Sequence, residues 1–151
     1  MQVVGGKIGK ETIYYEAPPR KSLESEMNNF LEWFNEVESN LIKACIAHLW
    51  FVVIHPFDDG NGRVARAVTD LVLSKIENSK ISRLYSMSEA INKDRNGYYK
   101  ALENTTGFVP KENPLDITLW CEWFLRTLLA ALLLLHREIW LSYFILGVSD
   151  R

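Results

Sequence analysis

One short stretch constrains this chain more than any other. Residues 55–66 read His-Pro-Phe-Asp-Asp-Gly-Asn-Gly-Arg-Val-Ala-Arg and lie between two segments of different hydrophobic pattern. The segment before it, Leu41 to Ile54, is apolar nearly all round, which predicts a central helix. The segment after it, Val64 to Ile76, repeats apolar residues at helical spacing, which predicts an amphipathic helix. The sequence therefore predicts a polar loop held between a buried helix and a half-buried one.

This loop carries the residue types of a phosphate site. Gly60, Asn61 and Gly62 tolerate positive φ, so the backbone can curl and direct successive N–H groups at one point. A helix that begins near Gly62 adds its free N–H groups and the positive end of its dipole. Arg63 and Arg66 share one face of that helix. Two cations in a first helical turn oppose the helix dipole, and a bound polyanion supplies the missing negative charge.

Two further side chains of the loop bring reactive chemistry. Asp59 offers a hard oxygen ligand to a Mg²⁺ ion that is shared with the phosphates. His55 has an unperturbed pKa of about 6.5, which suits a general base that acts on a second group. Taken singly, these residues have ordinary interpretations: the aspartates as helix caps, Gly-Asn-Gly as a tight turn, and Phe57 as a core residue that fixes the loop. Their combination favours a catalytic site.

Residues 55–66 resemble the signature of the Fic family, His-x-Phe-x-(Asp/Glu)-Gly-Asn-Gly-Arg-x-x-Arg, at every specified position. The resemblance implies a mainly α fold, a Fic-type helical bundle with a short N-terminal β-hairpin flap. It implies a protein adenylyltransferase that transfers AMP from ATP to a Ser, Thr or Tyr hydroxyl of a target protein, with His55 as general base and Mg²⁺ on Asp59. The nucleotide-binding and phosphate-binding residues that it implies are Asp59, Gly60, Asn61, Gly62, Arg63 and Arg66.

The first twenty residues differ from the rest of the chain. Two short β segments, at Gln2–Val4 and Thr12–Tyr15, flank a Gly-rich turn, and prolines follow them. Because a lone hairpin is marginal in water, it must pack on the helices. The resemblance implies that this hairpin is the flap, which covers the active site and holds the target segment by strand addition. The flap residues near nucleotide and target are then Val4, Gly5, Gly6 and Lys7.

The remaining pattern is helical. Ser22 is a plausible N-cap for a first helix to about Val37, with Leu31 in its core stripe, and Leu71 is expected on the buried face of the helix after the loop. Asp94 is expected to cap a later helix. We predict a Fic domain over residues 1–137, with the hairpin in 1–20 and a helical core in 21–137. Residues 138–151 form an apolar C-terminal extension of uncertain structure.

Three positions outside the loop have expected roles. The Tyr98-Tyr99 pair resembles the family segment that lines the adenine pocket, so Tyr98 is the candidate for that contact, and Tyr99 is expected to be exposed. A polar residue that often follows this Tyr falls at Thr106, with Asn104 as the alternative. His48 precedes the motif on the central helix and is expected to support the loop structurally.

Composition limits the partners and the compartment. The chain of 151 residues is 48% hydrophobic, enough for one domain with a core, and its net charge of −2 gives no support for a nucleic-acid surface. The apolar run 128–135 is short for a bilayer, so we expect a core or partner-facing helix and no membrane. Cys45 and Cys121 lack metal spacing and are expected to be buried thiols of a reducing compartment. With no secretory pattern at the N-terminus, we expect a cytoplasmic protein.

Regulation and two other functions stay open. Fic proteins are often inhibited by a helix with the pattern (Ser/Thr)-x-x-x-Glu-(Gly/Asn), whose Glu pairs with the second motif Arg, here Arg66. None of the Glu-Asn pairs at 77–78, 103–104 and 112–113 has Ser or Thr four residues earlier. We therefore expect that upstream residues are missing, that a partner supplies the inhibitory helix in trans, or that the enzyme is unrestrained; a homo-oligomer is also left open. The alternatives are removal of AMP or transfer of another phosphate-containing group at this site, and a non-catalytic nucleotide-binding interaction domain.

Overall fold

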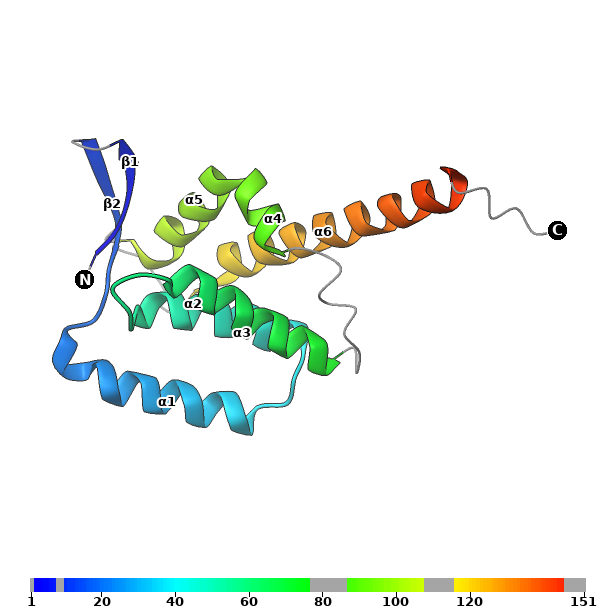
Figure 1. Cartoon of the computed structure of the whole chain (residues 1–151). Helices are drawn as coiled ribbons and strands as arrows, with labels where there is room; N and C mark the ends of the chain where they lie inside the picture. Colours follow the sequence, from blue (N-terminus) through cyan, green and yellow to red (C-terminus); the bar gives the residue numbers. More distant parts are fainter. Residues whose placement is uncertain (1, 8–9, 77–86, 108–115, 146–151) are drawn as a thin grey trace.

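The structure, a computed structural model, describes residues 2–7, 10–76, 87–107 and 116–145, with side chains from residue 17 to residue 144 within these ranges. The chain is mainly helical, as predicted (Figure 1). In chain order the elements are the strands β1 (Gln2–Lys7) and β2 (Lys10–Glu16), the short 3₁₀ helix η1 (Arg20–Ser22), and the helices α1 (Leu23–Glu36), α2 (Leu41–Ile54), α3 (Asn61–Ile76), α4 (Met87–Lys93), α5 (Arg95–Thr106) and α6 (Thr118–Ile145).

The two strands pair antiparallel, from Gln2 opposite Glu16 to Lys7 opposite Lys10, with a shift of register between Val3 and Val4. Strand β2 contacts α5. In Figure 1 the strands stand at one end of the molecule, and the far end of α6 projects at the other. The side chains of the predicted flap residues Val4 and Lys7 lie outside the described part of the chain, so their role stays a prediction.

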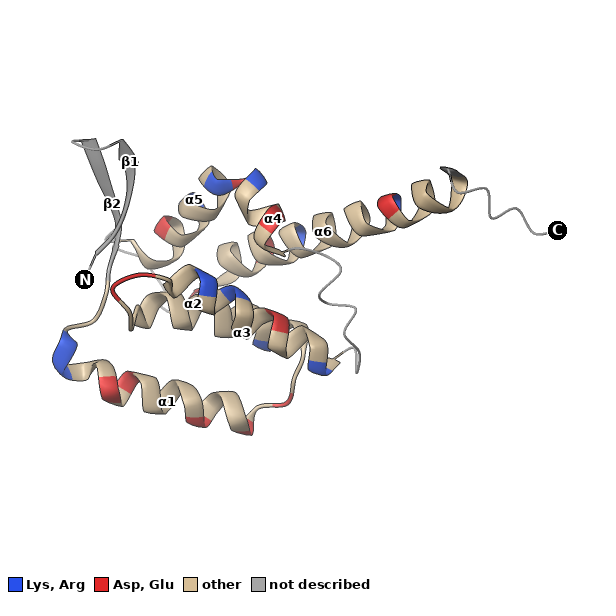
Figure 2. Cartoon of the chain, viewed as in Figure 1, with Lys and Arg blue, Asp and Glu red and all other residues tan. Residues whose placement is uncertain are grey.

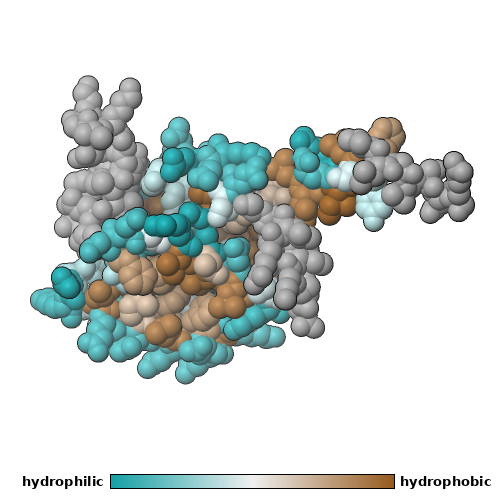
Figure 3. Space-filling model, in the orientation of Figure 1, coloured by the Kyte–Doolittle hydropathy of each residue, from teal (hydrophilic) through white to brown (hydrophobic). Residues whose placement is uncertain are grey.

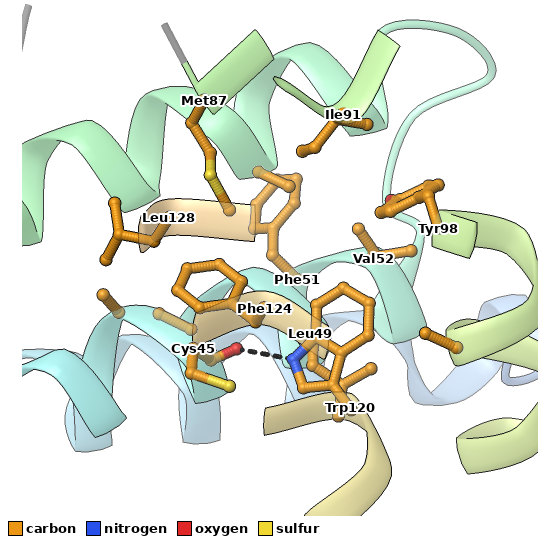
Figure 4. Close-up of a cluster of buried hydrophobic side chains, with 14 of the residues drawn as sticks. Cys45, Leu49, Phe51, Val52, Met87, Ile91, Tyr98, Trp120, Phe124 and Leu128 are labelled. Atoms are coloured by element: carbon orange, nitrogen blue, oxygen red, sulfur yellow. Dashed lines mark hydrogen bonds between the residues drawn. The ribbon is translucent and has the colours of Figure 1, made fainter. Parts of the chain in front are cut away.

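Helix α2 occupies the centre of the molecule. It contacts α1, α3 and α6, and most of its residues are buried, as its all-round apolar pattern predicts. Asn40 caps its start by accepting a hydrogen bond from the main-chain N–H of Lys43 at 2.8 Å. Figure 4 shows side chains from α2, α4, α5 and α6 meeting in the core, with the Trp120 Nε1–H donating to the main-chain oxygen of Cys45 at 3.0 Å.

A buried lysine connects α1 to α2. Lys43 on α2 is 3% exposed, and its Nζ donates to the main-chain oxygens of Phe34 and Val37 at the end of α1. The same Nζ lies 4.7 Å from the centre of the Phe34 ring. A cation at a helix C-terminus satisfies carbonyl groups that have no partner within the helix. Lys43 therefore caps α1 from the core side.

Three sequence predictions about side chains of α1 and α3 were wrong. Ser22 does not cap α1, because its hydroxyl donates to the main-chain oxygen of Pro19 instead. Leu31 and Leu71, expected in the core, are about half exposed. On α3 the buried side is formed instead by a row that includes two polar residues, Asn61 and Thr69, which hydrogen-bond to neighbouring segments. The predicted cap at Asp94 is confirmed, since its side chain accepts from the N–H of Gly97.

Helix α6 has two different halves. Its first half enters the core through Trp120, Phe124 and Leu128, whereas Trp140 and Phe144 on its second half are exposed and stack on each other with ring centres 5.7 Å apart. Figure 3 shows hydrophobic residues along this projecting part. By length and composition the stretch Thr118–Phe144 is also sufficient to cross a membrane. The helix continues without a break through residues 137 and 138, and the predicted domain limits stay a prediction.

Candidate active site

The loop between α2 and α3 begins with a backbone conformation that only some residues adopt. His55 follows the last residue of α2 with φ 51° and ψ 57°, in the left-handed region, where non-glycine residues are uncommon. Its N–H donates to the main-chain oxygen of Phe51 at 3.1 Å, which closes the end of α2. This conformation turns the chain sharply, so the loop begins at His55.

The side chain of Asn61 holds the loop in shape. Its Oδ1 accepts from the Phe57 N–H at 2.9 Å, and its Nδ2 donates to the Phe57 main-chain oxygen at 2.6 Å. Asn61 is 4% exposed, so both bonds are shielded from water. Gly60 adopts φ 90°, which a side chain would strain. Asn61 was predicted to bind phosphate. In the structure, both polar atoms of its side-chain amide form hydrogen bonds to the main chain of the loop instead.

The charged residues of the loop fall into two groups. Asp59 and Arg63 form an ion pair of 2.8 Å, with side chains 90% and 71% exposed. Arg66, one turn further along α3, is half-buried, and no ion pair to it is present in the described part of the chain. Figure 2 shows the acidic loop leading into α3, which carries several basic residues. An exposed ion pair of this kind is worth about 0–1 kcal/mol, so a ligand can displace Arg63 from Asp59 at little cost.

A pocket of about 330 Å³ lies over this loop, within the size range of small-molecule sites. It brings together most of the predicted site residues, while Arg63, paired with Asp59, does not line it. Its walls are Val52, His55, Asp58, Asp59, Gly60, Asn61, Gly62, Arg66, Tyr98, Tyr99 and Leu102.

Hydrogen bonding and burial set the state of His55. Its Nδ1 lies 3.2 Å from the main-chain oxygen of Val52. Because a carbonyl can only accept, Nδ1 carries the proton and Nε2 keeps a free lone pair. Partial burial lowers the pKa of His55, and the Val52 carbonyl opposes this shift by favouring the charged ring. The imidazole is therefore neutral at pH 7, the form that accepts a proton.

His48 is buried completely on α2, among the rings of Tyr98, Trp120 and Phe124. Its Nδ1 lies 3.0 Å from the Thr69 hydroxyl on α3. Burial, and to a smaller extent the charge of Arg66, lowers the pKa of His48 to about 3. It does not line the pocket. His48 thus ties α2 to α3 just behind the loop, in keeping with the structural role expected for it.

Two tyrosines line the pocket, whereas only Tyr98 was predicted to contact adenine. Tyr98 lines the pocket but is 9% exposed and packs among aromatic rings, and its pKa is raised by burial. Tyr99, expected to be merely exposed, lines the same pocket and is the more accessible ring. Sequence reasoning also missed Leu102, which lines the pocket. Leu102 follows Tyr98 by four residues and Tyr99 by three, so helical spacing could have placed it on the same face. Neither Thr106 nor Asn104 lines the pocket.

The protein groups at this site could hold a Mg²⁺ ion only together with the phosphates of a ligand. The described residues contain no group of three or more His, Cys, Asp or Glu side chains that could hold a metal. Asp59 is highly exposed beside the pocket, and Mg²⁺ is commonly held by one or two carboxylates plus substrate phosphates. One carboxylate at a phosphate site is thus compatible with that mode of binding.

Comparison with known proteins gives the same family as the motif. Residues 1–73 match the model of the Fic/DOC family. The chain is similar to a protein adenylyltransferase Fic of Aedes aegypti, with 27% identity over an alignment of 133 residues that covers 78% of this chain and 26% of that protein. A protein adenylyltransferase Fic of Nematostella vectensis is 36% identical over 62 residues, covering 38% of this chain and 14% of that protein.

A third relative, a protein adenylyltransferase of Caenorhabditis elegans, is 35% identical in an alignment of 81 residues that covers 48% of this chain and 16% of that protein. The chain thus spans about a quarter or less of the length of these relatives. The predicted resemblance to the Fic family is confirmed, with the family match lying in the half of the chain that contains the loop.

Proposed function

We propose that this chain is a protein adenylyltransferase, which transfers AMP from ATP to a hydroxyl group of a target protein. The observation that carries the proposal is Arg66, a half-buried guanidinium in the same pocket as a neutral His55, with no ion pair in the described part of the chain. A partly buried cation without a counter-charge favours an anionic ligand. The family match and the names of the relatives support a nucleotide as that ligand.

The phosphates of ATP would lie against Gly60–Gly62 and the start of α3. The first N–H groups of this helix have no partner within the helix, and its dipole favours negative charge. Arg66 would bind phosphate oxygens from the pocket side. Arg63 would leave its exposed pair with Asp59 to bind a second phosphate, and Asp59 would then be free to hold Mg²⁺. When bound, Mg²⁺ neutralises part of the phosphate charge.

His55 would act as the general base through Nε2. The hydroxyl of the target gives its proton to this nitrogen, and its oxygen attacks the α-phosphorus of ATP. The bond between the α-phosphorus and the bridging oxygen breaks, and pyrophosphate leaves. The Val52 carbonyl accepts the hydrogen bond from Nδ1, so it stabilises the charged ring that forms. The chain's contribution is mainly to position the reactants and to neutralise charge.

The remaining contacts are assigned by position. Tyr98 and Tyr99 would line the adenine end of the pocket, where aromatic rings suit a planar base. The hairpin β1–β2 would serve as the flap, with Val4, Gly5, Gly6 and Lys7 beside the nucleotide and the target segment. We further propose that the chain is cytoplasmic. No acidic partner of Arg66 is found within the described residues, which supports an inhibitory helix supplied from outside this part of the chain, for example by a partner in trans.

Mass spectrometry of the purified chain after incubation with ATP and Mg²⁺ tests the proposal. The expected result is the added mass of AMP on the chain itself or on an added target. His55→Ala should abolish the transfer and keep ATP-dependent thermal stabilisation, whereas His136→Ala, at an exposed position on α6, should behave like the parent protein. In parallel incubations, transfer of UMP from UTP or of phosphocholine from CDP-choline in place of AMP from ATP, or removal of AMP from a modified target, would refute the assignment of the reaction. ATP binding without any transfer would indicate a binding domain.

A further inference from the structure

A second cleft opens beside His55. It has a volume of about 450 Å³ and shares His55 and Asp58 with the pocket over the loop. Its other walls come from the segment 17–23 before and at the start of α1, from the end of α2, and from the first part of the loop. The two cavities therefore meet at the proposed base and extend from it along different elements.

The most informative wall of this cleft is Phe57. It was expected to be a core residue, but its side chain is 49% exposed, with its ring centre 6.3 Å from that of Phe51. Asn61 binds the main-chain N–H and oxygen of Phe57, so the position of this residue is set by its backbone and not by burial of its ring. The loop thus presents an aromatic ring at the surface of a cleft that contains His55.

Most of the other residues that line the cleft have apolar side chains, and two, Arg20 and Asp58, are charged. Leu23 and Pro18 are half-buried and line it together with Phe57. Both charged side chains are exposed, and the described part of the chain contains no ion pair of either residue. Such a cleft suits a flat apolar group flanked by polar main chain or charged side chains.

We propose that this cleft binds the aromatic ring of an acceptor tyrosine, and that tyrosine is the preferred acceptor of the chain. The inference rests on the proposed function. If the phosphates fill the pocket over the loop, an acceptor hydroxyl must reach His55 from another side. In tyrosine a whole ring separates the hydroxyl from the main chain, whereas in serine and threonine a single carbon does. A tyrosine ring can therefore occupy the cleft between Phe57 and Leu23 while its hydroxyl meets His55.

The chemical step is balanced. The phenolic O–H gives its proton to Nε2 of His55, and a bond forms between the phenolic oxygen and the α-phosphorus of ATP. The bond from that phosphorus to the bridging oxygen breaks, and the electron pair leaves with pyrophosphate. No oxidant or further reactant is needed.

Three peptide pools with the same randomised flanks and a central Tyr, Ser or Thr, incubated with labelled ATP and Mg²⁺, test the preference. We expect the Tyr pool to be labelled at least about tenfold faster, the discrimination typical of an apolar pocket. Phe57→Ala, and Leu23→Ala on a different element, should each raise KM for the Tyr pool by about tenfold with a smaller effect on kcat. Phe144→Ala, which removes an exposed ring on the projecting part of α6, is the matched control. Equal labelling of the Ser or Thr pool would overturn the inference, as would an unchanged KM in both cleft variants.

A binding measurement separates this inference from the proposed function. Saturation-transfer NMR with N-acetyl-tyrosinamide and N-acetyl-serinamide needs no nucleotide transfer. We expect contact with the tyrosine compound only, and its loss in Phe57→Ala and Leu23→Ala. That result supports the cleft even if no AMP is transferred, in which case only the proposed reaction fails. Absence of tyrosinamide binding overturns the cleft assignment even if AMP is transferred to another hydroxyl.

Discussion

Acidification should destabilise this fold through His48. The folded protein holds this ring neutral, with a pKa of about 3, while the unfolded chain has the ordinary value near 6.5. A depressed pKa in the folded state stabilises the protein above pH 6.5, and that stability is lost as the pH falls from 6.5 towards 3. At pH 5 the unfolded chain binds a proton at this position and the folded chain does not. The linkage relation gives a loss of about 2 kcal/mol between pH 8 and pH 5.

Urea unfolding of the parent chain and of His48→Phe at these two pH values measures the effect. Phenylalanine fits the ring-lined site and removes a buried Nε2 that has no hydrogen-bond partner. It loses the bond to Thr69, whose hydroxyl keeps its bond to the main-chain oxygen of Ala65. At pH 8 we therefore expect the two proteins to differ by about 1 kcal/mol or less. Between pH 8 and pH 5, the difference in free energy of unfolding between variant and parent should shift by about 2 kcal/mol in favour of the variant.

A matched control separates His48 from the other histidines. His136 is exposed on α6, so His136→Gln should lose stability on acidification as the parent does. His55, whose pKa is also lowered by burial, is present in all three proteins and cancels in the comparison. If His48→Phe and the parent lose the same free energy of unfolding between pH 8 and pH 5, the reasoning that places a neutral His48 in the core is wrong.

Four further predictions follow from single contacts. Lys43→Met should lower the free energy of unfolding by about 2–3 kcal/mol in urea titrations, because two carbonyls at the end of α1 lose a charged donor, and a change below about 0.5 kcal/mol would contradict the cap. Asn61→Ala should abolish ATP-dependent thermal stabilisation, whereas Asn61→Asp, which keeps one bond to Phe57, should retain part of it. The rate of AMP transfer should fall as the pH drops below the pKa of His55, itself lowered from 6.5, and a rate that rises there would argue against a base. Burial raises the pKa of the Cys45 thiol, so iodoacetamide should label it only after unfolding, as read by peptide mass spectrometry.

Periodicity was sufficient to predict the helices but not which side of each one is buried. The apolar pattern placed Leu71 on the buried side of α3, and the structure leaves it about half exposed. The helix is turned so that Asn61 and Thr69 face inward, where they bind Phe57 and His48. A hydrophobic pattern considers apolar residues only, so it cannot predict that a helix buries the face whose polar residues form hydrogen bonds in the core.

The loop motif indicated the chemistry of the site, but parts of its geometry were not accessible from sequence. The left-handed backbone of His55 and the bond from its ring to the Val52 carbonyl depend on where α2 ends, and helix ends are predicted to within a few residues at best. Phe57 was assigned to the core because apolar residues are usually buried, yet that rule does not hold for a residue whose backbone is fixed by a neighbour. Tyr99 lines the pocket because of where α5 lies relative to the loop, and only the assembled fold defines that position.

The side chain of Asn61 connects the two cavities beside His55. By binding both main-chain groups of Phe57, it closes the loop from residue 57 to residue 61 into one turn. Gly60 of this turn lines the pocket over the loop, and Phe57, its first residue, lines the second cleft. A residue that sequence reasoning assigned to phosphate contact thus shapes the loop beside both the proposed nucleotide pocket and the proposed acceptor cleft. A buried amide is well suited to this role, because its donor and acceptor satisfy two backbone groups that neither helix can reach.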